Sequence, residues 1–354
     1  MLSLAVFLPI VCGLLLLLLG KQVSHRARQV LVETVTVVTS LLVLLCLLNR
    51  RGTVYTPFYL LPSLPIRFAI DGVGSVFTAI VAFLWPLAAL YGFEYMEHEG
   101  GENHFFALYT ITYGVTLGIS TAANILTLYF FYEFLTLSTL PLVMHGTEKP
   151  SERAGYTYML YSFFGAALAF IGVMLVISYG DGGAFAMGGV MAQAAAEHPT
   201  MVQLGYLCAF LGFGVKAAVF PFHAWLPEAS VAPTPVTALL HAVAVVKSGV
   251  FAIIRVTYFS FGAQVLRGTT AQNIALLLAS ATIVYGSTMA VKEHHFKRRL
   301  AYSTVSNLSY IVLAASLMTQ SGLTAALAHM LFHALIKITL FFCAGAVMVK
   351  TGRT

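Results

Sequence analysis

The chain has 354 residues, of which 59% are hydrophobic and 9% charged, and its formal net charge is +6. A soluble domain carries about 25% charged residues, so this composition excludes a water-soluble globular protein. No long basic run occurs, which argues against nucleic-acid binding. Apolar runs of about 20 residues match a hydrocarbon core of roughly 30 Å, and they lack the alternation of a membrane β-barrel. We therefore expect an all-α polytopic membrane protein.

Hydropathy divides the chain into eleven expected transmembrane helices. In the first, the basic residues follow the apolar core, so we interpret it as a retained helix and not as a signal peptide. The stretches 49–72 and 180–200, which are rich in Gly, Pro or small residues, are expected to be loops. The helices are expected at residues 3–20, 30–48, 73–93, 104–122, 124–144, 156–179, 203–222, 235–258, 272–291, 300–319 and 322–349.

The lysine and arginine residues between these helices or near their ends predict the orientation, because cytoplasmic loops carry an excess of them. With the N-terminus outside, eleven face inward and five outward, which favours an external N-terminus and a cytoplasmic C-terminus. The inward set is Lys21, Arg26, Arg28, Lys149, Arg153, Lys292, Lys297, Arg298, Arg299, Lys350 and Arg353, and the outward set is Arg50, Arg51, Arg67, Arg255 and Arg267.

Four charged residues lie near the middle of the bilayer in the expected helices: Glu133, Lys216, Lys247 and Lys337. A charge near the bilayer centre costs about 2.5–3.5 kcal/mol even on the insertion scale. Any one of them alone could be a structural anchor, a buried ion pair or a snorkelling side chain. Four at similar depth, accompanied by histidines, favour a role in carrying an ion across the membrane.

The histidines lie close to two of these lysines. In "HMLFHALIK", His329, His333 and Lys337 follow one another at four-residue spacing and share one stripe of a helix. His241 precedes Lys247 by six residues and faces the same sector. A His-x3-His pair can bind zinc, but no carboxylate or thiolate lies nearby, so we expect no metal and interpret the stripe as a proton relay. The cysteines stand singly and predict small buried side chains, not ligands or disulfides: Cys12, Cys46, Cys208 and Cys343.

Pro221 predicts a break in the helix that carries Lys216. Proline removes a backbone donor and clashes with the preceding turn, so the helix is expected to open after Lys216. Breaks of this kind line cavities and mark ion sites in transporters. Glu133 is the candidate counter-ion of Lys216, and separating the two would act as a proton switch. The turn "HAWLPEA" beyond the break contains His223 and Glu228, which either assist proton entry or cap the turn.

Four sequence blocks between residues 100 and 350 resemble one family, the antiporter-like membrane subunits of complex I, membrane-bound hydrogenases, formate hydrogenlyases and Mrp-type cation/proton antiporters. The blocks are "FFYEFLTLSTLPL", "GFGVKAAVFPFHAWLPEASVAPTPVTALLHAVAVVKSGVFAIIR", "KRRLAYSTVSNLSY" and "HMLFHALIKITLFFCAGAV". The resemblance implies two inverted five-helix repeats, each with a discontinuous helix. It also implies that Glu133, Lys216 and Lys247 are the family's glutamate, broken-helix lysine and central lysine. The connection toward the second half would be lined by His329, His333 and Lys337.

The resemblance divides the chain into three parts. Residues 1–100 would hold three N-terminal helices, residues 101–260 the first antiporter repeat with its broken helix near Pro221, and residues 261–354 part of the second repeat. Family members usually have more helices and a further lysine or glutamate on the second broken helix. We therefore expect either a divided or truncated chain or a partner chain that completes the channel.

The leading hypothesis is a proton-translocating subunit, with sodium as the alternative ion, of a redox-driven complex in the inner membrane of a prokaryote. The chain itself would bind no cofactor, and iron–sulfur clusters, flavin or quinone would lie in partner subunits. Another antiporter-like chain would be among those partners. The alternative is an Mrp-type sodium/proton antiporter subunit that is not coupled to redox chemistry. An inert scaffold and a membrane-embedded enzyme or quinone-binding subunit remain as further alternatives.

Overall fold

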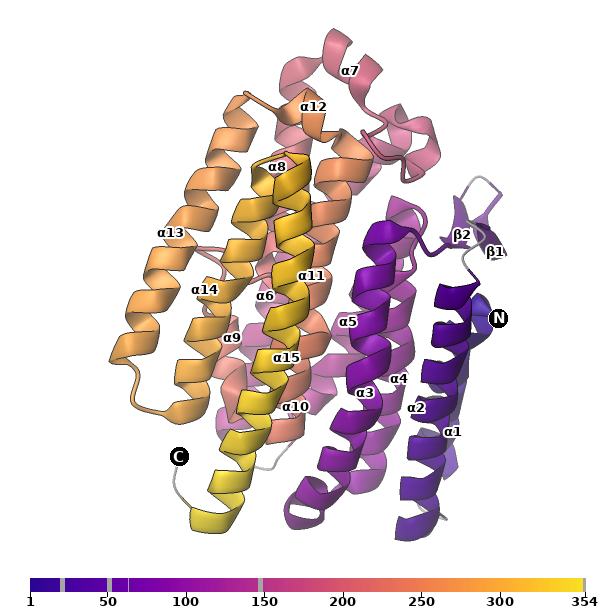
Figure 1. Ribbon diagram of the computed structural model, residues 1–354, viewed down its shortest axis with the longest axis vertical. Helices are drawn as coiled ribbons and strands as arrows, with labels where there is room; N and C mark the ends of the chain where they lie inside the picture. Colours follow the sequence, from indigo (N-terminus) through magenta and orange to yellow (C-terminus); the bar gives the residue numbers. More distant parts are fainter. Residues whose placement is uncertain (20–22, 50–52, 63, 146–148, 353–354) are drawn as a thin grey trace.

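The computed structural model describes residues 1–19, 23–49, 53–62, 64–145 and 149–352. Most of its helices run side by side along the long axis of the molecule (Figure 1). We call the end that carries the two β-strands the hairpin end, and the opposite end, where the last helix finishes, the C-terminal end. Four basic residues used in the orientation prediction lie outside the described residues: Lys21, Arg50, Arg51 and Arg353.

Helices occupy all eleven expected positions. Within the described residues, eight helical segments are long and apolar enough to cross a membrane: α1, α2, α3, α5, α6, the segment Thr234–Phe261, α13 and α15. The long helices are α1 (Leu2–Leu19), α2 (His25–Leu48), α3 (Gly72–Glu99), α4 (Glu102–Ser120), α5 (Ile125–Val143), α6 (Lys149–Tyr179), α8 (Pro199–Lys216), α11 (Val245–Arg255), α13 (Thr270–Lys292), α14 (Phe296–Ser316) and α15 (Gln320–Thr351).

Several of these helices begin at a polar residue that caps the first turn. The Asn124 side chain accepts a hydrogen bond from Thr127 N at 2.8 Å, and Thr319 does the same for Gly322 N at 3.0 Å. Such caps satisfy backbone donors that would otherwise be unpaired at the helix N-terminus. They fix where α5 and α15 start, and so they fix the depth of the ionisable residues on both helices.

The two expected loops contain regular structure, which corrects the prediction. The stretch 49–72 forms an antiparallel hairpin of β1 (Tyr55–Leu61) and β2 (Leu64–Phe68). Phe68 is buried with its ring centroid 5.5 Å from that of Phe131, and this packing holds the hairpin on the helices. The stretch 180–200 contains the turn η2 (Asp181–Gly183) and α7 (Ala192–Glu197). Cys343, expected to be buried, is exposed on α15, and the other three cysteines are half-buried.

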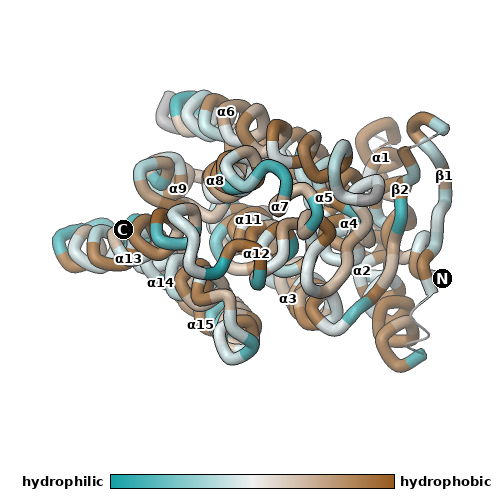
Figure 2. Tube along the Cα trace, turned by 90° about the horizontal axis from the view of Figure 1, so that it is seen from above, coloured by the Kyte–Doolittle hydropathy of each residue, from teal (hydrophilic) through white to brown (hydrophobic). Residues whose placement is uncertain are grey.

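The centre of the molecule is the segment Thr234–Phe261, which is entirely buried. It consists of α10 (Thr234–Ala238), η4 (Leu239–Val243), α11 and η5 (Val256–Phe261). Helices α8, α14 and α15 contact it, and Figure 2 shows α11 in the middle of the view from above. A helix surrounded by protein can carry charged side chains out of contact with lipid, so this segment is where ionisable residues are least costly.

Candidate functional site

Helix α8 ends at Lys216, which confirms the predicted break. Ala218 then adopts a left-handed conformation with φ of 55°, so the chain cannot continue as a helix there. Val215 O, in the last turn of α8, accepts hydrogen bonds from Ala218 N at 3.0 Å and from the indole Nε1 of Trp225 at 2.8 Å. The chain then resumes as α9 (Trp225–Glu228) and η3 (Ala229–Val231) before the central segment.

Lys216 is 1% exposed, and its partners come from α5. Its Nζ donates a hydrogen bond to Tyr132 O and lies 3.4 Å from the centroid of the Tyr132 ring. Glu133 is the next residue of α5, yet its Oε1 is buried without a hydrogen-bond partner. The expected ion pair between Glu133 and Lys216 is therefore not formed here, because a backbone carbonyl and an aromatic face hold the ammonium group instead.

A glycine brings the end of α8 against the central helix. A Cβ added at Gly249 would lie 2.4 Å from Ala217 N and 2.8 Å from Lys216 C. Only a residue without a side chain permits backbones to approach this closely. Gly249 is two residues beyond Lys247, so the same contact places the broken helix beside the central lysine.

His241 lies in a π-helical turn, η4, where Ala244 N donates to Leu239 O at 2.9 Å. Turns of this kind interrupt the ordinary helical ladder and are frequent at functional sites. The His241 ring is fully buried against Phe341 of α15, with centroids 4.8 Å apart, and both its nitrogens lack partners. Lys247 is also fully buried, and its Nζ forms a hydrogen bond with Nδ1 of His333 on α15. Both residues thus face α15.

The α15 stripe connects two helices. The rings of His329 and His333 are stacked with centroids 6.1 Å apart. Lys337, 3% exposed, donates to Leu300 O at 3.1 Å and to the Ser303 hydroxyl, both on α14. The stripe therefore meets α11 at His333 and α14 at Lys337, so the structure brings together the central lysine and the histidine–lysine stripe.

His223 and Glu228 lie apart from this line. His223 is buried, and its ring centroid is 4.4 Å from that of Tyr285 on α13. Glu228 is half-buried in α9, which packs against α14. Both residues thus face the α13–α14 side of the broken helix, and the structure gives neither a hydrogen bond to Lys216 or to the stripe.

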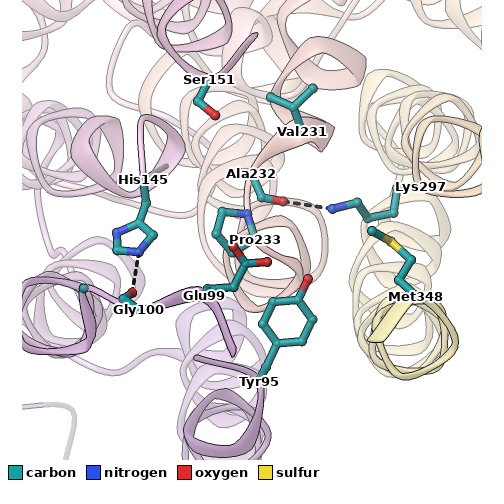
Figure 3. Close-up of a pocket in the computed structure, with 11 residues that line it drawn as sticks. Tyr95, Glu99, Gly100, His145, Ser151, Val231, Ala232, Pro233, Lys297 and Met348 are labelled. Carbon is teal, nitrogen blue, oxygen red and sulfur yellow. Dashed lines mark hydrogen bonds between the residues drawn. The ribbon is translucent and has the colours of Figure 1, made fainter. Parts of the chain in front are cut away.

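A pocket opens at the C-terminal end and was not anticipated. It has a volume of about 490 Å³, and Figure 3 shows Tyr95, Glu99 and Lys297 among the side chains around it. Lys297 is 4% exposed and donates a hydrogen bond to Ala232 O at 3.0 Å. From its position between two expected helices, Lys297 was expected to lie in a loop. The available signal was its position at the start of the block "KRRLAYSTVSNLSY".

Two arginines that were counted in the orientation prediction are also buried. Arg28, 5% exposed, pairs with Glu102, and Arg255, 1% exposed, pairs with Asp71. Burial alone would raise the pKa of Asp71, but the hydrogen bonds and charge of Arg255 and the Gly74 N–H hold that pKa below its ordinary value. Arg255, counted above on the outer side of the membrane, is therefore not an exposed loop residue, because its ion partner holds it inside the protein.

Within the described residues, no group of three or more His, Cys, Asp or Glu side chains is arranged to hold a metal ion. The stripe instead combines two imidazoles, His329 and His333, with the amine of Lys337. Imidazole titrates near neutrality and can donate on one nitrogen while accepting on the other. Such groups have the chemistry to pass protons, and one hydrogen bond, between Lys247 and His333, joins the stripe to the central helix.

A family model described as the transmembrane part of NADH:quinone oxidoreductase and the Mrp antiporter matches residues 122–354. A probable K⁺/H⁺ antiporter protein of Rhizobium meliloti is 32% identical over 297 residues, covering 82% of this chain and 29% of that protein. Among solved structures, the Mrp complex from a Dietzia species superposes with a TM-score of 0.88 at 25% identity, covering 99% of this chain and 38% of the other. Respiratory complex I from Thermus thermophilus superposes with a TM-score of 0.82 at 26% identity, covering 100% of this chain and 72% of the other.

The chain spans only part of the length of the curated relatives that it matches, from 29 to 58% of theirs. The matched region contains every residue of the candidate site, from Glu133 to Lys337.

Proposed function

Because the chain belongs to the family of NADH:quinone oxidoreductase and Mrp antiporter membrane proteins, we propose that it translocates protons as an antiporter-like subunit of a redox-driven complex. The complex would be of the complex I or membrane-bound hydrogenase type. The chain is a multi-pass integral membrane protein, and its structural neighbours are parts of multisubunit membrane complexes. Other membrane subunits, including a second antiporter-like chain, are its proposed partners.

The observation that carries the proposal is the hydrogen bond between Lys247 and His333. It joins two helices that are 86 residues apart in sequence, at the fully buried centre of the molecule. Within the described residues, no carboxylate forms an ion pair with any of the three membrane lysines, Lys216, Lys247 and Lys337. A purely structural lysine would be expected to have such a counter-ion, since an unpaired buried charge is costly.

Glu133 is the proposed point at which coupling enters. It is half-buried on α5 beside the exposed Phe134 and Leu137, so it lies between the lipid-facing surface and Lys216. A neighbouring subunit on that surface could move Glu133 toward or away from Lys216. Forming the pair favours the charged lysine and breaking it favours proton release. His241, His329, His333 and Lys337 would carry the proton onward, and His223 and Glu228 would assist at the break.

The finer architecture is part of the same proposal. We assign residues 1–100 to three N-terminal helices, residues 101–260 to the first repeat and residues 261–354 to part of a second repeat. All eleven long helical segments would cross the membrane, with the N-terminus outside and the C-terminal end in the cytoplasm of a prokaryotic cell. Iron–sulfur clusters, flavin or quinone would belong to partner subunits.

The alternative is a subunit of an Mrp-type sodium/proton antiporter without redox coupling. The similarity to the Rhizobium relative and to the Dietzia structure supports this alternative. Purification of the tagged chain in mild detergent, with its partners identified by mass spectrometry, separates the two. Iron–sulfur or hydrogenase subunits support the redox-driven complex. Membrane subunits alone support the antiporter.

Proton transport is tested in inverted vesicles that contain the complex. Lys216→Ala and Glu133→Ala are expected to abolish or sharply reduce driven transport while the subunits still assemble. Thr339→Ala, an exposed position on α15, is the control and is expected to transport like the wild type. Wild-type transport in both site variants would remove the proposal.

A further inference from the structure

The central helix carries another cation between Lys247 and the hairpin end. Lys247, Phe251 and Arg255 follow one another at four-residue spacing along α11, so they share one face of the helix. Arg255 lies about 12 Å beyond Lys247, at about 1.5 Å of rise per residue. It is 1% exposed, and its Nε is buried without a partner.

Asp71 closes this path from the outside. Its carboxylate accepts hydrogen bonds from both terminal nitrogens of Arg255, with Nη2 to Oδ1 at 2.8 Å. It also accepts one from Gly74 N at 2.7 Å. The Asp71 side chain is 40% exposed at the hairpin end, whereas Arg255 is buried beneath it. The pair therefore presents its carboxylate to the surface and its guanidinium to the protein interior.

Aromatic rings and backbone surround the guanidinium. Its Cζ lies 5.2, 5.0 and 4.6 Å from the ring centroids of Phe185, Phe251 and Phe259. The chain after Phe185 is joined to η5 by hydrogen bonds, among them Val190 N to Ser260 O at 2.8 Å. Rings at this distance attract a cation and exclude water, so Arg255 is held at a dry position.

The two ends of the molecule differ in their cavities. At the C-terminal end, the pocket of Figure 3 reaches Lys297. At the hairpin end, a hollow of about 310 Å³ is lined by Tyr258 and Arg267, and neither Arg255 nor Lys247 lines it. The pocket thus reaches Pro233, directly before the central segment, whereas Arg255 covers Lys247 from the hairpin end.

We propose that Arg255 and Asp71 form a seal that prevents cations from passing between Lys247 and the hairpin side of the membrane. A guanidinium does not lose its proton in a protein, so it cannot relay one, and its fixed charge repels a cation strongly where the dielectric is low. Fixed arginines exclude protons from other membrane pores in this way. This inference rests on the proposed function and deepens it, since it makes the buried line accessible from the C-terminal end alone.

The test is passive proton leak in inverted vesicles that contain the assembled complex. The vesicle interior is acidified by an ATP-driven pump, the pump is stopped, and the decay of the pH gradient is followed. Vesicles from cells without the chain give the background. Arg255→Gln is expected to raise the leak through the complex by about tenfold, which corresponds to a barrier lowered by about 1.4 kcal/mol. Arg255→Lys is expected to retain most of the seal.

Two further variants separate a seal from general damage. Adding Lys247→Ala to Arg255→Gln is expected to return the leak to background, because the leak would pass through Lys247. Arg267→Gln, which removes an exposed arginine at the same end, is expected to leave the vesicles tight. The proposal is overturned if a normally assembled Arg255→Gln protein shows no increase in proton leak. It is also overturned if that leak is unchanged by Lys247→Ala.

A labelling measurement keeps the native pair and so does not depend on whether Arg255 variants assemble. Ser248, fully buried beside Lys247, is changed to cysteine in a chain whose native cysteines are replaced by serine. A membrane-impermeant thiol reagent added on the hairpin side is expected to leave it unlabelled, and labelling from that side overturns the seal. Neither measurement drives the complex. If Lys216 and Glu133 variants transport normally, the proposed function fails while the leak and labelling results still decide the seal.

Discussion

A lysine inside a membrane protein needs partners for its ammonium hydrogens, and the three membrane lysines have three different kinds. Lys216 has a backbone carbonyl and a tyrosine ring, Lys247 has an imidazole, and Lys337 has a hydroxyl and a carbonyl. These neutral groups can accept a hydrogen bond from an amine as well as from an ammonium group. Residues with such surroundings can change charge without losing every partner.

The Lys247–His333 contact gives the first prediction. Lys247→Met and His333→Leu are each expected to reduce driven proton transport strongly, because each removes one side of the same hydrogen bond. The double variant is expected to be no worse than the poorer single variant, since residues that act as a unit are non-additive. Transport in inverted vesicles provides the measurement. Additive losses would mean that the two residues act in separate steps.

Asp71 gives a prediction on pH. Its pKa is held below the ordinary value in the folded protein, so its ion pair stabilises the fold at neutral pH and loses that effect as the pH falls through the folded-state pKa. Asp71→Asn is therefore expected to lower the thermal stability of the purified complex at pH 7. The difference from the wild type is expected to shrink once the pH is lowered below about 4. A difference that stays constant over this range would exclude a titrating Asp71 as its cause.

At the scale of the element, the break after Lys216 depends on how closely α8 approaches α11. Gly249→Ala would place a Cβ 2.4 Å from Ala217 N, and a backbone atom cannot move aside without a large energetic cost. We expect a loss of about 1–3 kcal/mol, the usual cost of overpacking, together with reduced transport because the two lysines move apart. Thermal unfolding of the complex and vesicle transport measure the two effects.

Gly214→Ala is the matched control for that variant. Gly214 is buried in α8, two residues before Lys216, but its added Cβ would meet Val219 at an ordinary 3.5 Å. Alanine also favours a helix interior over glycine by about 1 kcal/mol. We expect unchanged or slightly higher stability and normal transport. Equal damage from both glycine variants would show that α8 tolerates no added side chain, and the close approach at Gly249 would lose its special role.

Helices and the helix break could be predicted from the sequence wherever a single physical property, such as hydropathy or a proline, determines them. Runs such as residues 30–48 and 322–349 are apolar over a membrane thickness, so hydropathy alone located α2 and α15. The break after Lys216 followed from Pro221. The hairpin was missed because its register depends on packing against Phe131, far along the chain. The π-helical turn around His241 was missed because neither proline nor glycine marks it, and the surrounding helices determine its geometry.

At the scale of the whole molecule, residue types were easier to predict than their relationships. Lys247 and His333 were both recognised, but not their contact, because 86 residues separate them. Glu133 was expected to pair with Lys216. The Lys216 ammonium group instead donates its hydrogen bond to the backbone carbonyl of the neighbouring Tyr132. The burial of Arg255 was not predicted, because its partner Asp71, at the start of α3, lies 184 residues away in sequence.

The last prediction concerns the surface beside Glu133. Phe134 and Leu137 of α5 are 44% and 58% exposed next to this half-buried carboxylate, so a subunit that drives Glu133 should pack there. A photo-crosslinking amino acid at position 137 is expected to give one defined adduct with another membrane subunit in intact cells. Position 44 on α2, where Leu44 is 49% exposed, is the control for lipid-facing surface and is expected to give no adduct with that same subunit. An assembled, active complex without an adduct at position 137 would mean that coupling does not arrive through this face, and Glu133 would then act only within its own chain.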